Sequence, residues 1–108
     1  MRQLIGGLIV TLALCGPAAA QEAPTTPDPA NGRALAGELC ASCHLTSPED
    51  KGPVPDGIPT FMAVAARPGL NEAALTAALL KQHPVMPQPP LTSRQTADVV
   101  AYILSLRR

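Results

Sequence analysis

The sequence predicts one small all-α domain, and three observations support this prediction. The chain has 108 residues, which is enough for a single small domain. Its 13 prolines leave no stretch in which apolar and polar residues alternate as they do in a half-buried strand. Several short segments instead carry apolar residues at spacings of three and four, and each follows a residue type that caps helices.

The first helix is expected from Pro29 to about Ser42. Asp28 has the side chain of an N-cap residue, and proline is favoured at the first helical position that follows it. Two residue stripes run along this helix at spacings of four: Leu35 with Leu39, and Gly32 with Ala36 and Cys40. The second stripe is made of small residues, so we expect another helix to approach closely there.

The middle of the chain is expected to form a long loop and a short helix. Residues 45–59 contain four prolines and two glycines, which allow nothing longer than a turn. Residues 60–67 can form a short helix that Pro68 and Gly69 end.

Two further helices complete the predicted domain. Asn71 caps a helix that runs to about Gln82, and a proline-dense loop over residues 84–90 follows it. Thr92, with Gln95 three residues later, forms a capping box for the last helix. The apolar residues of this last helix are Val99, Val100, Ile103, Leu104 and Leu106.

The first twenty residues are typical of a secretory signal. Arg2 gives a positive start, residues 4–14 are apolar, and three alanines at residues 18–20 form a cleavage site of small residues. The apolar stretch is too short for a membrane-spanning helix, although a retained N-terminal anchor is the alternative. We therefore expect residues 1–20 to be removed on export to the periplasm, residues 21–28 to form a flexible leader and residues 29–108 to form the domain.

The composition excludes some functions and indicates a bound group. Removal of residues 1–20 takes away Arg2 and Cys15, which leaves seven basic residues against eight acidic ones and a single pair of cysteines. No block of basic residues suggests binding to nucleic acid or to a membrane surface. With one Phe, one Tyr and no Trp, a core of this size needs a disulfide, a metal or a prosthetic group to stabilise it.

Residues 40–44 read Cys-Ala-Ser-Cys-His, which is the C-x-x-C-H motif of covalent haem attachment. Residues at positions i, i+3 and i+4 share one face of a helical turn. Two thiols placed in this way can form thioethers with the two vinyl groups of one porphyrin, while the adjacent imidazole reaches the iron. The sequence therefore predicts one haem c, bound through Cys40 and Cys43, with His44 as an axial iron ligand.

Three other uses of the two cysteines are possible. A zinc site would need two more ligands, and His83 is the one histidine left to supply them. A thioredoxin-like redox pair belongs to a βαβ unit, which this sequence does not predict. A plain disulfide suits an exported protein but leaves the weak core unexplained.

With this motif in place, residues 28–107 resemble the small class I cytochromes c of bacteria. The resemblance covers the helix that leads into the motif, a loop with Gly52 and Pro53, a methionine loop and an amphipathic last helix. It implies a class I cytochrome c fold, with crossed N- and C-terminal helices around one haem. It also implies contact between Gly32 and Tyr102, and a hydrogen bond from the His44 ring to the carbonyl of Pro53.

The sixth iron ligand has three candidates. Met62 adjoins Phe61 on the short helix, where packing is the simpler role. His83 ends a helix, and ligation by two histidines through it is the alternative. Met86 lies in a proline-rich loop 42 residues after His44, and the resemblance points to the same residue. We therefore expect Met86 to be the second axial ligand.

Two axial ligands leave no open position on the iron, so we expect an electron carrier that cycles between Fe(III) and Fe(II) and not an enzyme. The resemblance implies that its partners are redox proteins, one that donates an electron and one that accepts it. Two alternatives stay open: a haem subunit held by a larger periplasmic dehydrogenase, and a haem enzyme or gas binder with an open iron.

Overall fold

The computed structural model describes residues 12, 15–19, 26–81 and 85–108 of the chain. These residues form four helices: α1 (Pro29–Leu39), α2 (Phe61–Ala65), α3 (Glu72–Leu80) and α4 (Ser93–Ser105). The described residues contain no strand, so the predicted all-α class is confirmed. None of the helices in this part of the chain has the length and apolar character that a bilayer crossing requires.

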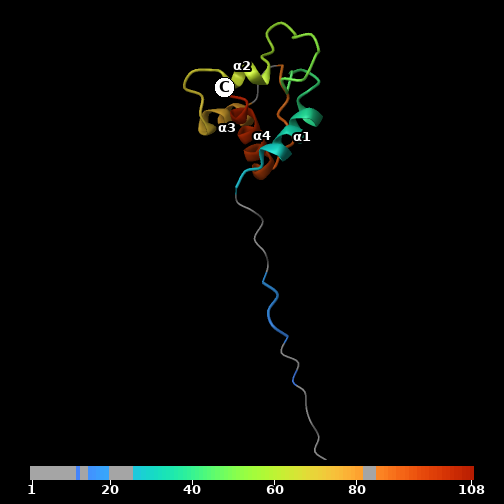
Figure 1. Ribbon diagram of the computed structural model, residues 1–108, viewed down its shortest axis with the longest axis vertical. Coiled ribbons are helices and arrows are strands. Elements are labelled where there is room, and N and C mark those ends of the chain that lie inside the picture. Colours follow the sequence, from blue (N-terminus) through green and yellow to red (C-terminus); the bar gives the residue numbers. More distant parts are fainter. Residues whose placement is uncertain (1–11, 13–14, 20–25, 82–84) are drawn as a thin grey trace, which may run out of the picture.

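The last helix, α4, is the element on which the other three pack (Figure 1). The contact between α1 and α4 is the most extensive, and the two helices cross as expected. Val99, Val100 and Ile103 are the largest fully buried side chains, and all three lie on one face of α4. The buried core comprises these three and Ala36, Cys40, Phe61, Ala65, Leu75, Leu79 and Tyr102.

The helices begin where their caps predict. The carboxylate of Asp28 accepts hydrogen bonds from the backbone N–H groups of Ala30 and Asn31 at the start of α1. Thr92 and Gln95 cap α4 reciprocally, each side chain bonding to the backbone N–H of the other. Caps of this kind satisfy amide groups that would otherwise lack partners in the first turn of a helix.

Three helices are shorter than expected. The first, α1, ends at Leu39 and not near Ser42, because Cys40 takes a φ of −116° and the chain continues as a turn. The second, α2, ends at Ala65, where the expected range extends to Arg67. The third, α3, ends at Leu80 and not near Gln82, because Lys81 takes an extended conformation with a φ of −83° and a ψ of 132°.

Gly32 sets the distance between α1 and α4. A Cβ atom at this position would collide with the backbone carbonyl of Asp98 and lie 2.9 Å from the Cβ atom of Tyr102. The expected contact between Gly32 and Tyr102 is therefore confirmed. Because the neighbouring atoms belong mainly to backbone, they cannot move aside without shifting a helix.

Asp98 is a carboxylate buried at the same crossing, with 2% of its surface exposed. It accepts hydrogen bonds from the backbone N–H of Asp28 at 2.7 Å and from the side-chain amide of Asn31 at 2.8 Å. The Nε of Arg94 donates a third at 3.2 Å. The hydrogen bonds from Asp28 and Asn31 hold the pKa of Asp98 below its ordinary value, although burial opposes this. Asp98 thus ties the start of α1 to α4.

Substitution of Gly32 should test the crossing. We expect Gly32→Ala to lower the free energy of unfolding by about 2 kcal/mol, because overpacking in a close contact costs about 1–3 kcal/mol. Gly37 is a matched control on the same helix, since a Cβ there meets nothing within 4 Å. Gly37→Ala should raise the free energy of unfolding by about 0.5–1 kcal/mol. Urea unfolding of the two variants measures both values. Equal changes in the free energy of unfolding would contradict the proposal that Gly32 sets the distance between α1 and α4.

Acidification should test Asp98. Asp98→Asn should lower the free energy of unfolding at neutral pH by about 2 kcal/mol, because the amide nitrogen cannot accept a hydrogen bond. Since the folded-state pKa is lowered, the ionised carboxylate stabilises the fold above the unfolded-state pKa of about 3.9. This contribution is lost as the pH falls through the folded-state pKa.

The stability difference between wild type and Asp98→Asn should therefore be constant between about pH 5 and pH 7 and shrink below about pH 4. Urea unfolding at a series of pH values measures it. A difference that grows on acidification would show that the carboxylate is not held in its ionised form.

Candidate haem-binding site

The two cysteines and the histidine of the motif lie within a single turn that follows α1. The backbone N–H groups of Cys43 and His44 both bond to the carbonyl of Cys40, at 3.1 and 2.9 Å. Both cysteines are free thiols, with Cys40 buried and Cys43 exposed. Burial raises the pKa of the Cys40 thiol, which keeps it protonated at neutral pH. The motif therefore presents two unpaired sulfur atoms beside one imidazole.

A backbone carbonyl orients the ring of His44. The Nδ1 atom of His44 lies 2.6 Å from the carbonyl oxygen of Pro59. A carbonyl oxygen only accepts hydrogen bonds, so Nδ1 carries the hydrogen atom, and in the neutral ring the free electron pair is then on Nε2. This is the tautomer that a histidine needs in order to bind a metal through Nε2.

The expectation that Pro53 accepts this hydrogen bond is wrong, because Pro59 occupies that place. Pro59 directly precedes Thr60, whose side chain caps α2. The first residue of α2, Phe61, donates its backbone N–H to the carbonyl of Leu45 at 2.9 Å. This hydrogen bond brings the end of the loop over residues 45–59 next to Leu45, the residue that follows His44. Thr60 is a residue type that caps helices, and in the sequence it marks the point where the loop comes back to this segment.

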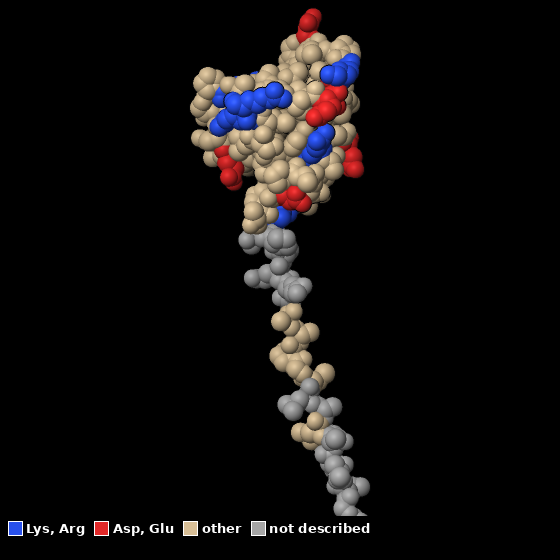
Figure 2. Space-filling view, in the orientation of Figure 1, with Lys and Arg blue, Asp and Glu red and all other residues tan. Residues whose placement is uncertain are grey.

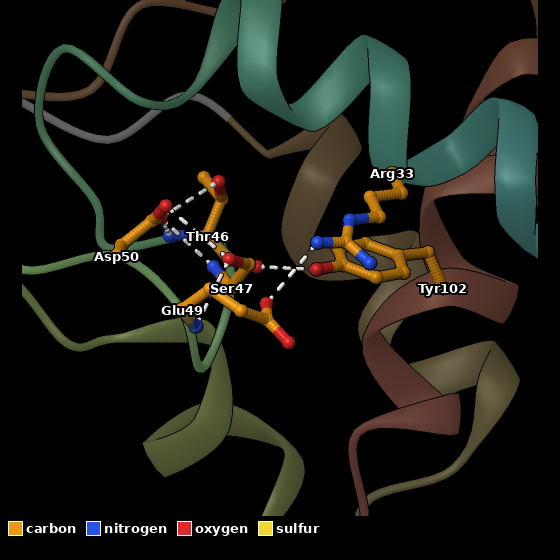
Figure 3. Close-up of polar contacts among 6 residues, drawn as sticks. All are labelled: Arg33, Thr46, Ser47, Glu49, Asp50 and Tyr102. Carbon is orange, nitrogen blue, oxygen red and sulfur yellow. Dashed lines mark hydrogen bonds and ion pairs between the residues drawn. The ribbon is translucent and has the colours of Figure 1, made fainter.

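The segment after His44 is held by residues that the sequence did not single out for this purpose (Figure 3). The hydroxyl of Tyr102, on α4, donates to the carbonyl of Thr46 at 2.7 Å. The carboxylate of Asp50 accepts hydrogen bonds from the backbone N–H groups of Thr46 and Ser47, at 2.8 and 2.9 Å. These two hydrogen bonds are the main reason why the pKa of Asp50 lies below its ordinary value.

The candidates for the second iron ligand lie in different places. Met86 is partly buried and packs against the core from the loop before α4. Met62 packs against the same core from within α2. His83 lies outside the described residues. Since both methionines pack against the core, their packing does not show which of them binds the iron. The expectation that Met86 is the second axial ligand stays a prediction.

Comparison with known proteins agrees with this arrangement. The sequence profile of the cytochrome c family matches residues 29–107, which include the whole motif and all four helices. This chain belongs to the cytochrome c family. It is 36% identical over 101 residues to cytochrome c-552 of Bradyrhizobium diazoefficiens, an alignment that covers 94% of this chain and 93% of that protein. No solved structure matches the chain significantly.

Membership of the cytochrome c family implies a covalent haem c, electron transfer and redox partners. Members of the family are typically electron carriers and not enzymes. The residues of this site fit such a group, because two free thiols and the imidazole of His44, which the carbonyl of Pro59 orients, share one turn. Within the described residues, no group of three or more Cys, His, Asp and Glu side chains could hold a metal ion.

Proposed function

We propose that this protein is a periplasmic electron carrier with one haem c. In this proposal Cys40 and Cys43 form the thioethers, and His44 and Met86 are the axial iron ligands. The observation that carries the proposal is the contact between Nδ1 of His44 and the carbonyl of Pro59, because it leaves Nε2 free to bind iron. The signal-like residues 1–20 support export.

The residues of the chain act by binding the group and fixing its ligands. When bound, the haem supplies the one-electron Fe(III)/Fe(II) couple. The hydrogen bond to Pro59 fixes the tautomer of the His44 imidazole and holds the plane of its ring. Phe61 is buried and its ring centre lies 5.5 Å from that of His44, so it covers one side of the imidazole with apolar surface.

Met86 is proposed as the second ligand because of the loop that carries it. Pro87, Pro89 and Pro90 restrict this loop on one side, and Leu91 bonds back to the carbonyl of Pro89 at 2.8 Å just before α4. A restricted loop loses little conformational entropy when its methionine binds. Bound to the iron together with His44, the thioether of Met86 would raise the reduction potential and leave no open position on the iron.

The surface charge is consistent with a redox protein as partner. Acidic and basic side chains are interspersed over the face of the domain shown in Figure 2. Strong steering of a charged partner needs a concentrated field of one sign. The face shown in Figure 2 carries no large, purely basic area of the kind that binds nucleic acid.

Haem attachment is tested with the cysteines. Denatured wild-type holoprotein should keep its haem, and Cys40→Ala combined with Cys43→Ala should abolish covalent retention. Haem staining of a denaturing gel measures this. Cys15→Ala is the matched control and should retain the haem, because Cys15 lies in the segment that we expect to be removed. Extraction of haem from the wild type by acidified organic solvent would refute the attachment.

Ligation by Met86 is tested against Met62. Ferric wild type should show the weak near-infrared absorption band of sulfur bound to haem iron, Met86→Ala should lose it, and Met62→Ala should keep it. Met86→His should lower the reduction potential, within the range of about 0.8 V that axial ligands span. Loss of the band in Met62→Ala alone would assign the sixth ligand to Met62.

A further inference from the structure

Contacts from the start of α2, from α4 and from Asp50 hold residues 44–47, which we call the histidine strap. The ring of His44 bonds to the carbonyl of Pro59, and the carbonyl of Leu45 accepts from the backbone N–H of Phe61. Thr46 is bonded on both sides, by Tyr102 at its carbonyl and by Asp50 at its N–H. Thr46 and Ser47 are buried, with 5% and 7% of their surface exposed.

We propose that Tyr102 and Asp50 are positioning residues that fix the histidine strap and, through it, the direction in which Nε2 of His44 points. The inference rests on the proposed ligation of iron by His44. Among the described residues, neither side chain is hydrogen-bonded to the histidine ring, so both act through the backbone of Thr46 and Ser47. Figure 3 shows the two side chains reaching this backbone from opposite sides.

Tyr102 links the helix crossing to the strap. Its Cβ atom lies against Gly32 at the contact between α1 and α4, while its hydroxyl reaches the carbonyl of Thr46. The hydrogen bond is buried, and it joins residues 56 positions apart in the sequence. Burial raises the pKa of the Tyr102 hydroxyl, so it stays protonated and able to donate. Without this hydroxyl, the carbonyl of Thr46 would lose its donor in a site with little access for water.

Asp50 closes the strap from the solvent side. Besides the two backbone N–H groups, its carboxylate accepts from the hydroxyls of Thr46 and Ser47, at 3.3 and 3.2 Å. Asp50 itself is exposed, whereas both residues that it binds are buried. Hydrogen bonds to an ionised acceptor are stronger than those between neutral groups. An exposed acid with four such bonds holds the turn after His44 in one conformation.

The neighbouring ion pair between Arg33 and Glu49 does not have this effect. Its atoms are 3.1 Å apart, but 57% and 68% of the two side chains are exposed. Ion pairs of this kind contribute little because water screens them.

Hydrogen exchange in the reduced holoprotein tests the proposal. NMR can follow the Nδ1–H proton of His44 and the backbone N–H proton of Thr46, with the backbone N–H proton of buried Val99 as the internal reference. Tyr102→Phe should speed exchange of the two strap protons by roughly tenfold relative to the Val99 proton. Ser105→Ala is the matched control, because it removes a hydrogen bond to the carbonyl of Tyr102 on the same helix but none to the strap. This control should leave the exchange rates of the two strap protons, taken relative to that of the Val99 proton, unchanged.

A second pair of variants makes the test independent of how well Tyr102→Phe folds. Asp50→Ala should speed exchange of the Thr46 proton by a similar factor, because it removes the one carboxylate oxygen that accepts from both backbone N–H groups. Asp56→Ala removes one carboxylate from the same loop and should have no effect, since Asp56 is exposed. Unchanged exchange of the strap protons in Tyr102→Phe and Asp50→Ala would overturn the proposal. So would acceleration no greater than that of the Val99 proton, because that is the result of a general loss of stability.

The wild-type spectrum separates failure of this inference from failure of the proposed function. If His44 is the iron ligand, its ring protons in the reduced protein are strongly shifted by the porphyrin ring current. If that shift is absent, ligation by His44 is wrong and the role of the strap falls with it. If the shift is present and the variants exchange like their controls, only the role of Tyr102 and Asp50 is wrong.

Discussion

The close approach of α1 and α4 at Gly32 is the constraint on which the rest of the structure depends. Because Gly32 has no side chain, the backbone of α4 comes near enough for Asp98 to accept from Asp28 and Asn31. The same approach places Tyr102 where its hydroxyl reaches Thr46, two residues after the histidine of the motif. A single added methyl group would therefore disturb both the helix contact and the segment that carries His44.

The domain relies on polar contacts where its core offers little apolar volume. One Phe, one Tyr and no Trp give a core made mostly of aliphatic side chains. Asp98 and Asp50 each gather several hydrogen bonds, and both have pKa values below the ordinary range for that reason. Within the described residues, no buried side-chain nitrogen or oxygen atom lacks a hydrogen-bond partner. When all buried polar atoms have hydrogen-bond partners, one conformation of the chain is favoured over the alternatives that would leave some of them unpaired.

Local signals predicted the helices well, and contacts between distant residues explain what was missed. The caps at Asp28 and Thr92 lie next to the residues that they bind, so the sequence alone indicates them. The acceptor for His44 depends on where a long loop comes back to the motif, so the expectation of Pro53 is wrong and the acceptor is Pro59. Asp50 resembles any loop acid in the sequence, and its role follows only from the turn that it closes. The contact between Gly32 and Tyr102 was expected because of the family resemblance and not because of any periodic pattern.

A crystal structure of the purified holoprotein would test most directly whether this fold presents His44 and Met86 to one haem iron. We expect continuous electron density from the sulfur atoms of Cys40 and Cys43 to the porphyrin, with Nε2 of His44 and the sulfur of Met86 on the iron. The hydrogen bond from Nδ1 of His44 to Pro59 should be kept. Iron bound by His83 or Met62 in place of Met86 would contradict the ligand assignment, and a His44 ring turned away from the iron would contradict the proposal as a whole.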